Sequence, residues 1–189
     1  CEDMAHINKE VIDPDELRLQ AISNLGIDFQ MSADELQKIS ESALAEKLYD
    51  EAYVSYLSKN KVIVDKTLPL LKQLLKNRGA VVQNIMVPFT DGIKQIGVSV
   101  NLQESVDSNG LVVITEMEKI ITVAIIDQVW KEHLRDMDDL KQSVQNAVYE
   151  QKDPLLIYKF EGFEMFKLFI GKVNQETMSL LIKSEIPIQ

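Results

Sequence analysis

Residues 126–147 read IDQVWKEHLRDMDDLKQSVQNA, and an apolar or aromatic side chain recurs in them every three or four positions. This spacing is a heptad repeat, the pattern of a long helix that packs one face against a partner. The repeating residues are Ile126, Trp130, His133, Met137, Leu140, Val144 and Ala147. The pattern therefore predicts a long helix here, with these side chains on its packed face.

A second heptad pattern follows the first after a short break at residues 151–154, QKDP. Asp153 can cap a helix and Pro154 suits the first helical turn. The second packed face is expected to consist of Leu156, Phe163, Phe166, Ile170, Val173, Thr177 and Leu180. Two helices that are joined by a short loop and carry one apolar face each should fold back as an antiparallel hairpin.

The N-terminal part of the chain carries several signals for helix ends. Asp13 before Pro14 is typical of a helix N-cap, and Gly26 is a plausible end of the same helix. Ser32 and Glu35 have the spacing of a capping box, which predicts a new helix start.

Apolar residues keep helical spacing from Leu36 as far as Leu75. Because proline disrupts the interior of a helix, we expect a break between two helices near Pro69. Residues 77–79, NRG, predict a helix end.

The segment from about residue 80 to residue 114 differs in character. It contains the strand formers Val81, Val82, Ile85, Val87 and Phe89, followed by a turn signal at residues 90–92 and a second alternating run, Ile96, Val98 and Val100. Residues 107–110, DSNG, indicate a loop. We predict a small β hairpin in an otherwise mainly α fold, because a chain with 7 Gly and 5 Pro has few turns and long elements.

The composition excludes several classes of protein. The chain of 189 residues has 20 Lys and Arg against 30 Asp and Glu, a formal charge of −10, so no nucleic-acid partner is expected. The single cysteine, Cys1, excludes a disulfide framework. The longest apolar run, residues 120–126, is far below the roughly 18–20 residues of a transmembrane helix. Because the chain begins without Met, we interpret it as a piece of a longer cytosolic protein without a signal peptide.

The sequence offers little for catalysis. It has no G-x-x-x-x-G-K-S/T, no G-x-G-x-x-G and no G-x-S-x-G motif, and its only histidines are His6 and His133. We interpret His133 as a packed residue of the helix, and the acidic side chains around it as a solvated face with i,i+4 partners. We therefore expect no catalytic residues, no metal site and no cofactor site.

Tyr149 has two interpretations, because it lies at or just before the connection between the two long helices. It could close the end of the hairpin core, which the spacing favours. It could also be an exposed contact residue, since aromatic residues on loops tend to mark contacts.

Two motifs in the third part of the chain resemble a known signature. The first is residues 125–134, IIDQVWKEHL, running on through residues 137–140, MDDL. The second combines residues 151–155, QKDPL, with residues 158–163, YKFEGF. Together they resemble, over about residues 116–186, the C-terminal region of the SecA family of preprotein translocase motor ATPases.

The resemblance implies a division of the chain into parts of the SecA scaffold and wing. Residues 1–12 would be the end of the long scaffold helix, residues 13–114 the helical wing with an inserted β hairpin, and residues 115–189 the scaffold's two-helix finger. Family members commonly have an arginine and glycines before the fingertip tyrosine, where this chain has residues 145–148, QNAV. The implied first helix of the finger is therefore longer and less basic.

The resemblance also implies a function for the chain within a full-length SecA-type motor. The chain would bind and hydrolyse no ATP, since ATP and Mg²⁺ would be held by motor domains outside it. It would transmit motor movement and contact the unfolded preprotein or the SecY channel complex through Tyr149, Gln151 and Lys152. The whole protein would be cytoplasmic and peripherally associated with the inner membrane.

Two other classes of function remain without the resemblance. The chain could be an autonomous helical adaptor whose hairpin docks a partner helix. An enzyme is the weaker alternative, because no nucleophile, base and orienting group can be assembled from the sequence.

Overall fold

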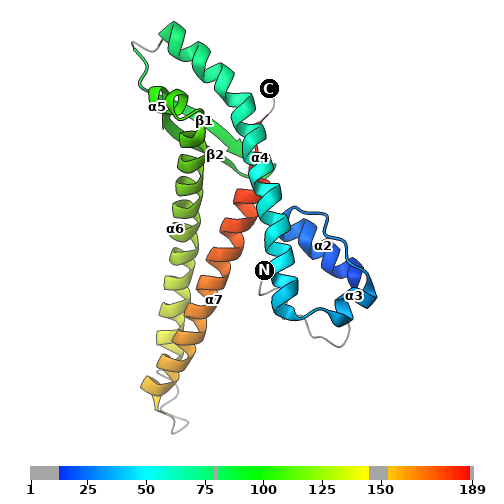
Figure 1. Ribbon diagram of the computed structural model, residues 1–189. Helices are drawn as coiled ribbons and strands as arrows, with labels where there is room; N and C mark the ends of the chain where they lie inside the picture. Colours follow the sequence, from blue (N-terminus) through cyan, green and yellow to red (C-terminus); the bar gives the residue numbers. More distant parts are fainter. Residues whose placement is uncertain (1–12, 79–80, 145–152, 188–189) are drawn as a thin grey trace. The chain divides into compact units, whose positions relative to one another are not determined.

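The computed structural model describes residues 13–78, 81–144 and 153–187. It confirms a mainly helical chain with one antiparallel two-stranded hairpin (Figure 1). The elements are α2 (Pro14–Leu25), α3 (Ala33–Lys38), α4 (Glu41–Arg78), β1 (Asn84–Thr90), β2 (Gln95–Asn101), α5 (Leu102–Asp107), α6 (Leu111–Ser143) and α7 (Pro154–Lys183).

The chain forms two compact units. The first comprises residues 1–118 together with residues 178–189, and the second comprises residues 119–177. The division predicted from the sequence instead separates residues 13–114 from residues 115–189, so the two schemes differ over residues 115–118 and residues 178–189. The predicted end of a scaffold helix at residues 1–12 lies outside the described residues.

The caps at the start of the first unit form as predicted. The side chain of Asp13 accepts a hydrogen bond from the backbone N–H of Asp15, and Gly26 ends α2 in the left-handed conformation with φ of 61°. Ser32 and Glu35 form a reciprocal capping box at the start of α3. Each cap satisfies backbone groups that have no partner inside a helix.

The core of this part gathers apolar side chains from α2, α3 and the first turns of α4. Phe29 in the α2–α3 connection is 2% exposed, because it closes the space between these helices. The cluster consists of Leu17, Ala21, Leu25, Ile27, Phe29, Leu36, Leu44, Leu48 and Ala52.

The predicted break near Pro69 is wrong. Helix α4 runs without interruption from Glu41 to Arg78, with Pro69 inside it. Ile63, Thr67 and Leu71 are buried at four-residue spacing on both sides of the proline. Burial of this continuous face outweighs the roughly 3 kcal/mol that an interior proline costs.

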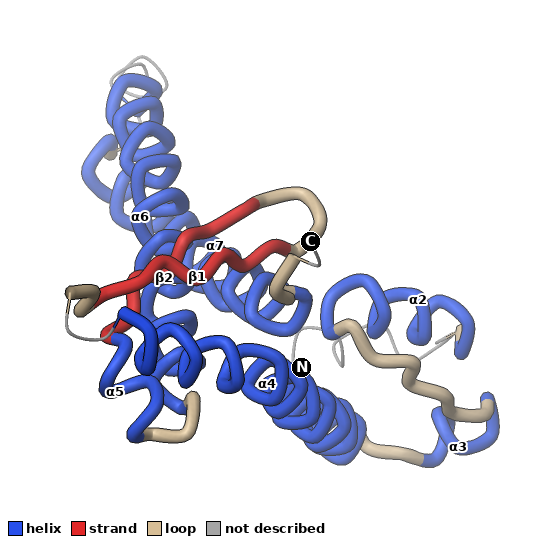
Figure 2. The backbone as a smooth tube through the Cα atoms, turned by 90° about the horizontal axis from the view of Figure 1, so that it is seen from above, coloured by secondary structure: helices blue, strands red, loops and turns tan. Residues whose placement is uncertain are grey.

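The predicted β hairpin is confirmed, and its two strands lie side by side in Figure 2. Val87 pairs with Val98, and Phe89 pairs with Ile96. At the turn, the Asp91 carboxylate accepts hydrogen bonds from the backbone N–H groups of Ile93 (2.9 Å) and Lys94 (2.7 Å). One face of the hairpin packs inward through Val87, Phe89, Val98 and Val100, each at most 6% exposed.

The sequence did not predict the short helix α5 or the bridge at the other end of the chain. Thr90 and Glu185 exchange two backbone hydrogen bonds of 2.8 Å. Glu185 thus forms an isolated antiparallel bridge with the last residue of β1. The loop predicted at residues 107–110 is shorter, since α5 includes Asp107 and the turn follows through Asn109 and Gly110, which both have positive φ.

Helices α6 and α7 are the two long helices that the heptad patterns predicted. Helix α7 begins at Pro154, and the Asp153 side chain accepts a hydrogen bond from the backbone N–H of Leu155 at 2.9 Å, as expected of a cap. No helix in the described part of the chain is long and apolar enough to cross a membrane.

Candidate functional site

In the second unit, α6 and α7 run antiparallel against each other. The Lys172 ammonium donates to the carboxylate of Glu132, and a Cβ added at Gly162 would meet Met137 at 3.3 Å and Leu140 at 3.9 Å. The residue numbers of α7 fall as those of α6 rise, which is the signature of an antiparallel pair. The two-helix hairpin predicted from the sequence is therefore present.

An aromatic cluster joins the two helices. His133 is 9% exposed, and its ring centroid lies 5.1 Å from that of Phe169 and 5.4 Å from that of Trp130. Phe166 completes the cluster, 5.7 Å from Phe169. His133 is thus a packed residue among aromatic rings, as the sequence predicted.

On α6 the buried stripe differs from the predicted one. Ile125 and Val129 are 3% and 2% exposed, whereas their neighbours Ile126 and Trp130 are each 42% exposed. The residues that face inward are spaced four apart, from Ile125 through Val129 to His133. Trp130 therefore lies at the margin of the stripe, and its ring reaches α7 sideways. Farther along, Met137 is half-buried and Leu140 is 6% exposed.

On α7 the difference is larger. Phe163 and Phe166, which were predicted to be packed, are 58% and 45% exposed, although the Phe166 ring still meets His133 of α6 edge-on with 6.2 Å between centroids. Gly162, Met165 and Phe169 also lie against α6. Because α7 carries large apolar side chains around most of its circumference, heptad spacing alone does not select one face. At Gly162 an added Cβ would come within 3.3 Å of the terminal methyl group of Met137, so this glycine allows a close approach of the two helices.

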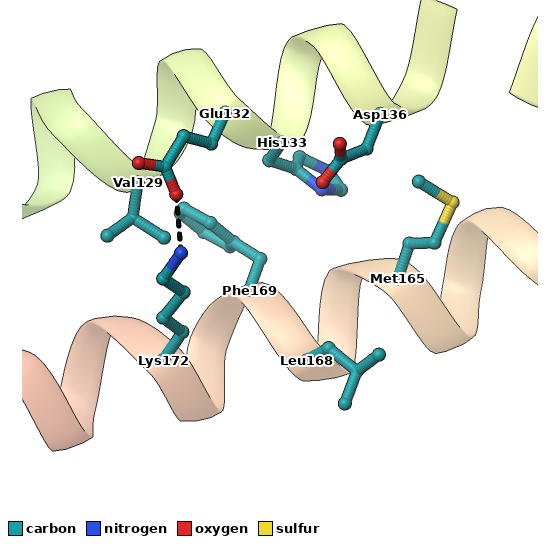
Figure 3. A pocket seen from close by; sticks show the side chains of 8 residues that line it. All are labelled: Val129, Glu132, His133, Asp136, Met165, Leu168, Phe169 and Lys172. Carbon is teal, nitrogen blue, oxygen red and sulfur yellow. Dashed lines mark hydrogen bonds and ion pairs between the residues drawn. The ribbon is translucent and has the colours of Figure 1, made fainter. Parts of the chain in front are cut away.

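A small cleft of about 120 Å³ opens between the two helices in this unit (Figure 3). The ion pair of Glu132 and Lys172 spans it, and the carboxylate of Asp136 lies near His133 in the same view. The cleft is lined by Val129, Glu132, His133, Asp136, Met165, Leu168, Phe169 and Lys172.

The main charges of the cleft are those of Glu132 and Lys172, which neutralise each other. The hydrogen bond from Lys172 lowers the pKa of Glu132, and the same bond raises the pKa of Lys172. Both groups thus keep their charges over the neutral range. Within residues 13–78, 81–144 and 153–187, no group of three His, Cys, Asp or Glu side chains is placed to hold a metal ion. The arrangement is suited to holding two helices together.

The predicted contact residues lie beyond what the structure describes. Tyr149, Gln151 and Lys152 fall in residues 145–152, between the described parts of α6 and α7. Their contact role stays a prediction.

Sequence reasoning missed an aromatic groove in the first unit. It has a volume of about 240 Å³ and lies between α4 and the last turns of α7. Tyr49 and Tyr53 stack with 5.9 Å between their ring centroids. The signal for it is the spacing of four and three residues between Tyr49, Tyr53 and Tyr56, which puts them on one helix face. The groove is lined by Tyr49, Ala52, Tyr53, Tyr56, Met178, Leu181 and Ile182.

A large apolar surface on α7 is open to solvent. Exposed apolar patches of this kind mark interaction surfaces in folded proteins. Its most exposed members are Leu155 (61%), Leu156 (52%), Phe160 (65%), Phe163 (58%) and Leu168 (73%). These residues lie on the same hairpin whose connection holds Tyr149.

Comparison with known proteins places nearly the whole chain in one family. The family model described as SecA Wing and Scaffold domain matches residues 2–185. The chain is 42% identical over all its 189 residues to the protein translocase subunit SecA of Cytophaga hutchinsonii. It is also 43% identical over 186 residues, 98% of the chain, to that of Christiangramia forsetii.

The chain spans only part of these relatives. It covers 17% of the length of each of the two SecA proteins. No solved structure matches the chain significantly. The family match nevertheless extends over nearly all of the chain, and the chain belongs to the SecA wing and scaffold domain family.

Proposed function

We propose that the chain is the non-catalytic wing and scaffold part of a SecA-type translocase, which drives preproteins through the SecY channel with ATP. The observation that carries the proposal is the match to the wing and scaffold family over residues 2–185, together with 42% identity over all 189 residues of the chain to part of a translocase subunit. In this proposal the chain transmits motor movement, and the hairpin contacts the preprotein or the channel near Tyr149.

The hairpin supports a mechanical role. Helix α7 has 30 residues, which at 1.5 Å per residue gives an element about 45 Å long. The aromatic cluster and the ion pair of Glu132 and Lys172 hold it against α6. A supported helix pair can carry a displacement over its length, whereas a flexible loop cannot.

ATP and Mg²⁺ belong, in this proposal, to motor domains outside the chain. The residues present do not fit a nucleotide, because the sequence lacks a glycine-rich loop that could cradle phosphates. The isolated chain should therefore show no ATP hydrolysis above a buffer control. The full-length protein would act at the cytoplasmic face of the inner membrane as a peripheral partner of the channel.

A matched shortening of the hairpin tests the proposal. One heptad is removed from each helix of the full-length protein, at residues 134–140 and 162–168, which face each other in the antiparallel pair. Transport of a preprotein into vesicles that contain the SecY complex should be lost, while ATP hydrolysis stays close to that of the unmodified protein. The control removes one heptad of α4, residues 72–78, far from the hairpin in sequence.

The adaptor interpretation expects a different result. An adaptor would use the exposed apolar side chains of α7 to dock a partner helix, and the full-length protein would not depend on hairpin length for transport. Normal transport by the shortened protein would contradict our proposal.

A further inference from the structure

The last turn of α7 is held by polar groups from three sides within the first unit. The Lys59 ammonium on α4 donates to the backbone oxygen of Leu181, and the Ser184 hydroxyl donates to that of Leu180 at 2.6 Å. Glu185, directly after the helix, pairs with Thr90 through its backbone. The last four carbonyls of a helix have no partner inside it, so these bonds complete the helix end.

Lys59 has a neighbour on α4 that reaches α6. Tyr56 lies one turn before it, and its hydroxyl donates to a carboxylate oxygen of Glu118 on α6 at 2.7 Å. The Lys59 ammonium lies 5.1 Å from the centroid of the Tyr56 ring, within the range of a cation–π contact. Two adjacent side chains of α4 thus connect to both long helices, in the order Leu181, Lys59, Tyr56 and Glu118.

The hydrogen bonds of Lys59 and Tyr56 lie in a partly buried environment, where apolar side chains are more usual. Lys59 and Tyr56 are half-buried, and their neighbour Asn60 is 8% exposed with an Oδ1 that has no partner among the described residues. Burial lowers the pKa of Lys59 to about 8, opposed by the charge of Glu185. An aliphatic side chain would fill this space without the desolvation of an ammonium group. Polar bonds differ from an apolar core in that they can break and re-form without exposing a large apolar surface.

We propose that Lys59 and Tyr56 are positioning residues, forming a polar joint that holds the first-unit ends of α6 and α7 on α4. Both helices continue unbroken from this joint into the second unit. The joint therefore restrains the two helices at the point where they leave the first unit. We further infer that an intact joint is needed for ATP hydrolysis to be converted into transport, and this inference rests on the proposed function.

The structural half of the proposal is tested by distances. Spin labels are attached at the exposed positions Lys66 on α4 and Lys183 at the end of α7, in a full-length protein without other cysteines. The distance distribution should be narrow in the unmodified protein and in Lys59→Arg, which keeps a cationic donor. It should broaden in Lys59→Met, which keeps the length of the stem but cannot donate. An unchanged distribution in Lys59→Met would overturn the joint.

The functional half is tested by coupling. In Lys59→Met and in Tyr56→Phe, preprotein transported per ATP hydrolysed should fall about fivefold, the factor expected for one lost hydrogen bond. Lys59→Arg should restore the ratio. The matched controls are Lys61→Met and Tyr49→Phe on the same helix, which should leave it unchanged.

The outcomes separate this inference from the proposed function. If the unmodified full-length protein does not transport a preprotein at all, the proposed function fails, and the spin-label distances still decide the joint. If the unmodified protein transports and Lys59→Met transports with the same ratio, the coupling inference is overturned while the proposed function stands.

Discussion

The indole ring of Trp130 on α6 meets the ring of Phe169 on α7 nearly edge-on, with 5.4 Å between centroids and 69° between the ring planes. Yet 42% of Trp130 remains exposed. Its contribution therefore combines two ring contacts, with Phe169 and with His133, and partial burial. Trp130→Ala should lower the free energy of unfolding by about 1–2 kcal/mol, below the roughly 3–5 kcal/mol for a fully buried Trp.

Denaturant unfolding measures this prediction. Val129→Ala is the matched comparison, because Val129 is 2% exposed and should cost about 2 kcal/mol although it is the smaller side chain. A loss above about 3 kcal/mol for Trp130→Ala would mean that the indole carries the helix contact after all.

We expect the ion pair between Glu132 and Lys172 to stabilise the contact between α6 and α7, and reversal of its charges tests this. Both side chains are partly exposed, so the pair is screened by salt. Glu132→Lys alone should lower the melting temperature, because Lys172 would then face a like charge. The double variant with Glu132→Lys and Lys172→Glu should recover most of the loss.

The measurement is thermal unfolding at low and at high salt. The difference between the single and the double variant should shrink as salt is added. Equal melting temperatures for the two variants at low salt would show that the pair does not contribute to the stability of the helix contact.

Two glycines should respond to substitution in opposite directions. Gly26 has φ of 61°, and an added Cβ would lie 3.0 Å from a methyl carbon of Ile182, so Gly26→Ala should destabilise by about 1 kcal/mol or more. Gly171 lies inside α7, and nothing lies within 4 Å of an added Cβ. Gly171→Ala should stabilise by about 0.5–1 kcal/mol, because alanine is the better helix former.

Both changes are read from denaturant midpoints at unchanged slope. Stabilisation by Gly26→Ala would contradict the left-handed cap at the end of α2. Destabilisation by Gly171→Ala would mean that its side of α7 is more closely packed than the structure shows.

Local signals predicted much of the fold, and packing decided the rest. The caps at Asp13, Ser32 and Asp153 depend on bonds within three residues, so the sequence was sufficient for them. The break expected at Pro69 did not occur, because the buried face of α4 continues past it. The packed face of α7 could not be chosen from spacing, since large apolar side chains lie around most of this helix.

The candidate site follows the same division. His133 was predicted to be packed, because a lone histidine on a heptad face has few other roles. The joint at Lys59 could not be predicted, since its partner is a backbone carbonyl of Leu181, 122 positions later in the sequence. No pattern of residue types in the sequence predicts such a bond.

The stability of the chain should rise with pH between about 8 and 10 because of Lys59. Burial lowers the pKa of Lys59 from 10.5 to about 8, so in this range the unfolded chain holds a proton that the folded chain has released. The free energy of unfolding rises with pH wherever the unfolded state binds more protons. Burial and Glu118 raise the pKa of Tyr56, so above about 10 the folded chain holds the extra proton and stability should fall again.

Denaturant unfolding at several pH values checks both limbs of this profile. The charged groups around Lys59 are Glu185, which favours its protonated form, and Glu118, which is bonded to Tyr56. Lys59→Met should remove the rise between pH 8 and 10 and keep the fall above it, whereas Tyr56→Phe should remove the fall. A rise that persists in Lys59→Met would assign it to another group.

The last prediction concerns Tyr149, which precedes residues 151–154, QKDP, in the sequence. A tyrosine presents a flat apolar face and one hydroxyl, so it can contact chains of many sequences by stacking and by hydrogen bonds to the backbone. If it contacts the moving preprotein or the channel, Tyr149→Ala in the full-length protein should slow transport while the melting temperature and basal ATP hydrolysis stay unchanged. Tyr149→Phe keeps the ring and should transport better than Tyr149→Ala. Unchanged transport in Tyr149→Ala would remove the contact role, and a large fall in its melting temperature would instead assign Tyr149 to closing the hairpin core.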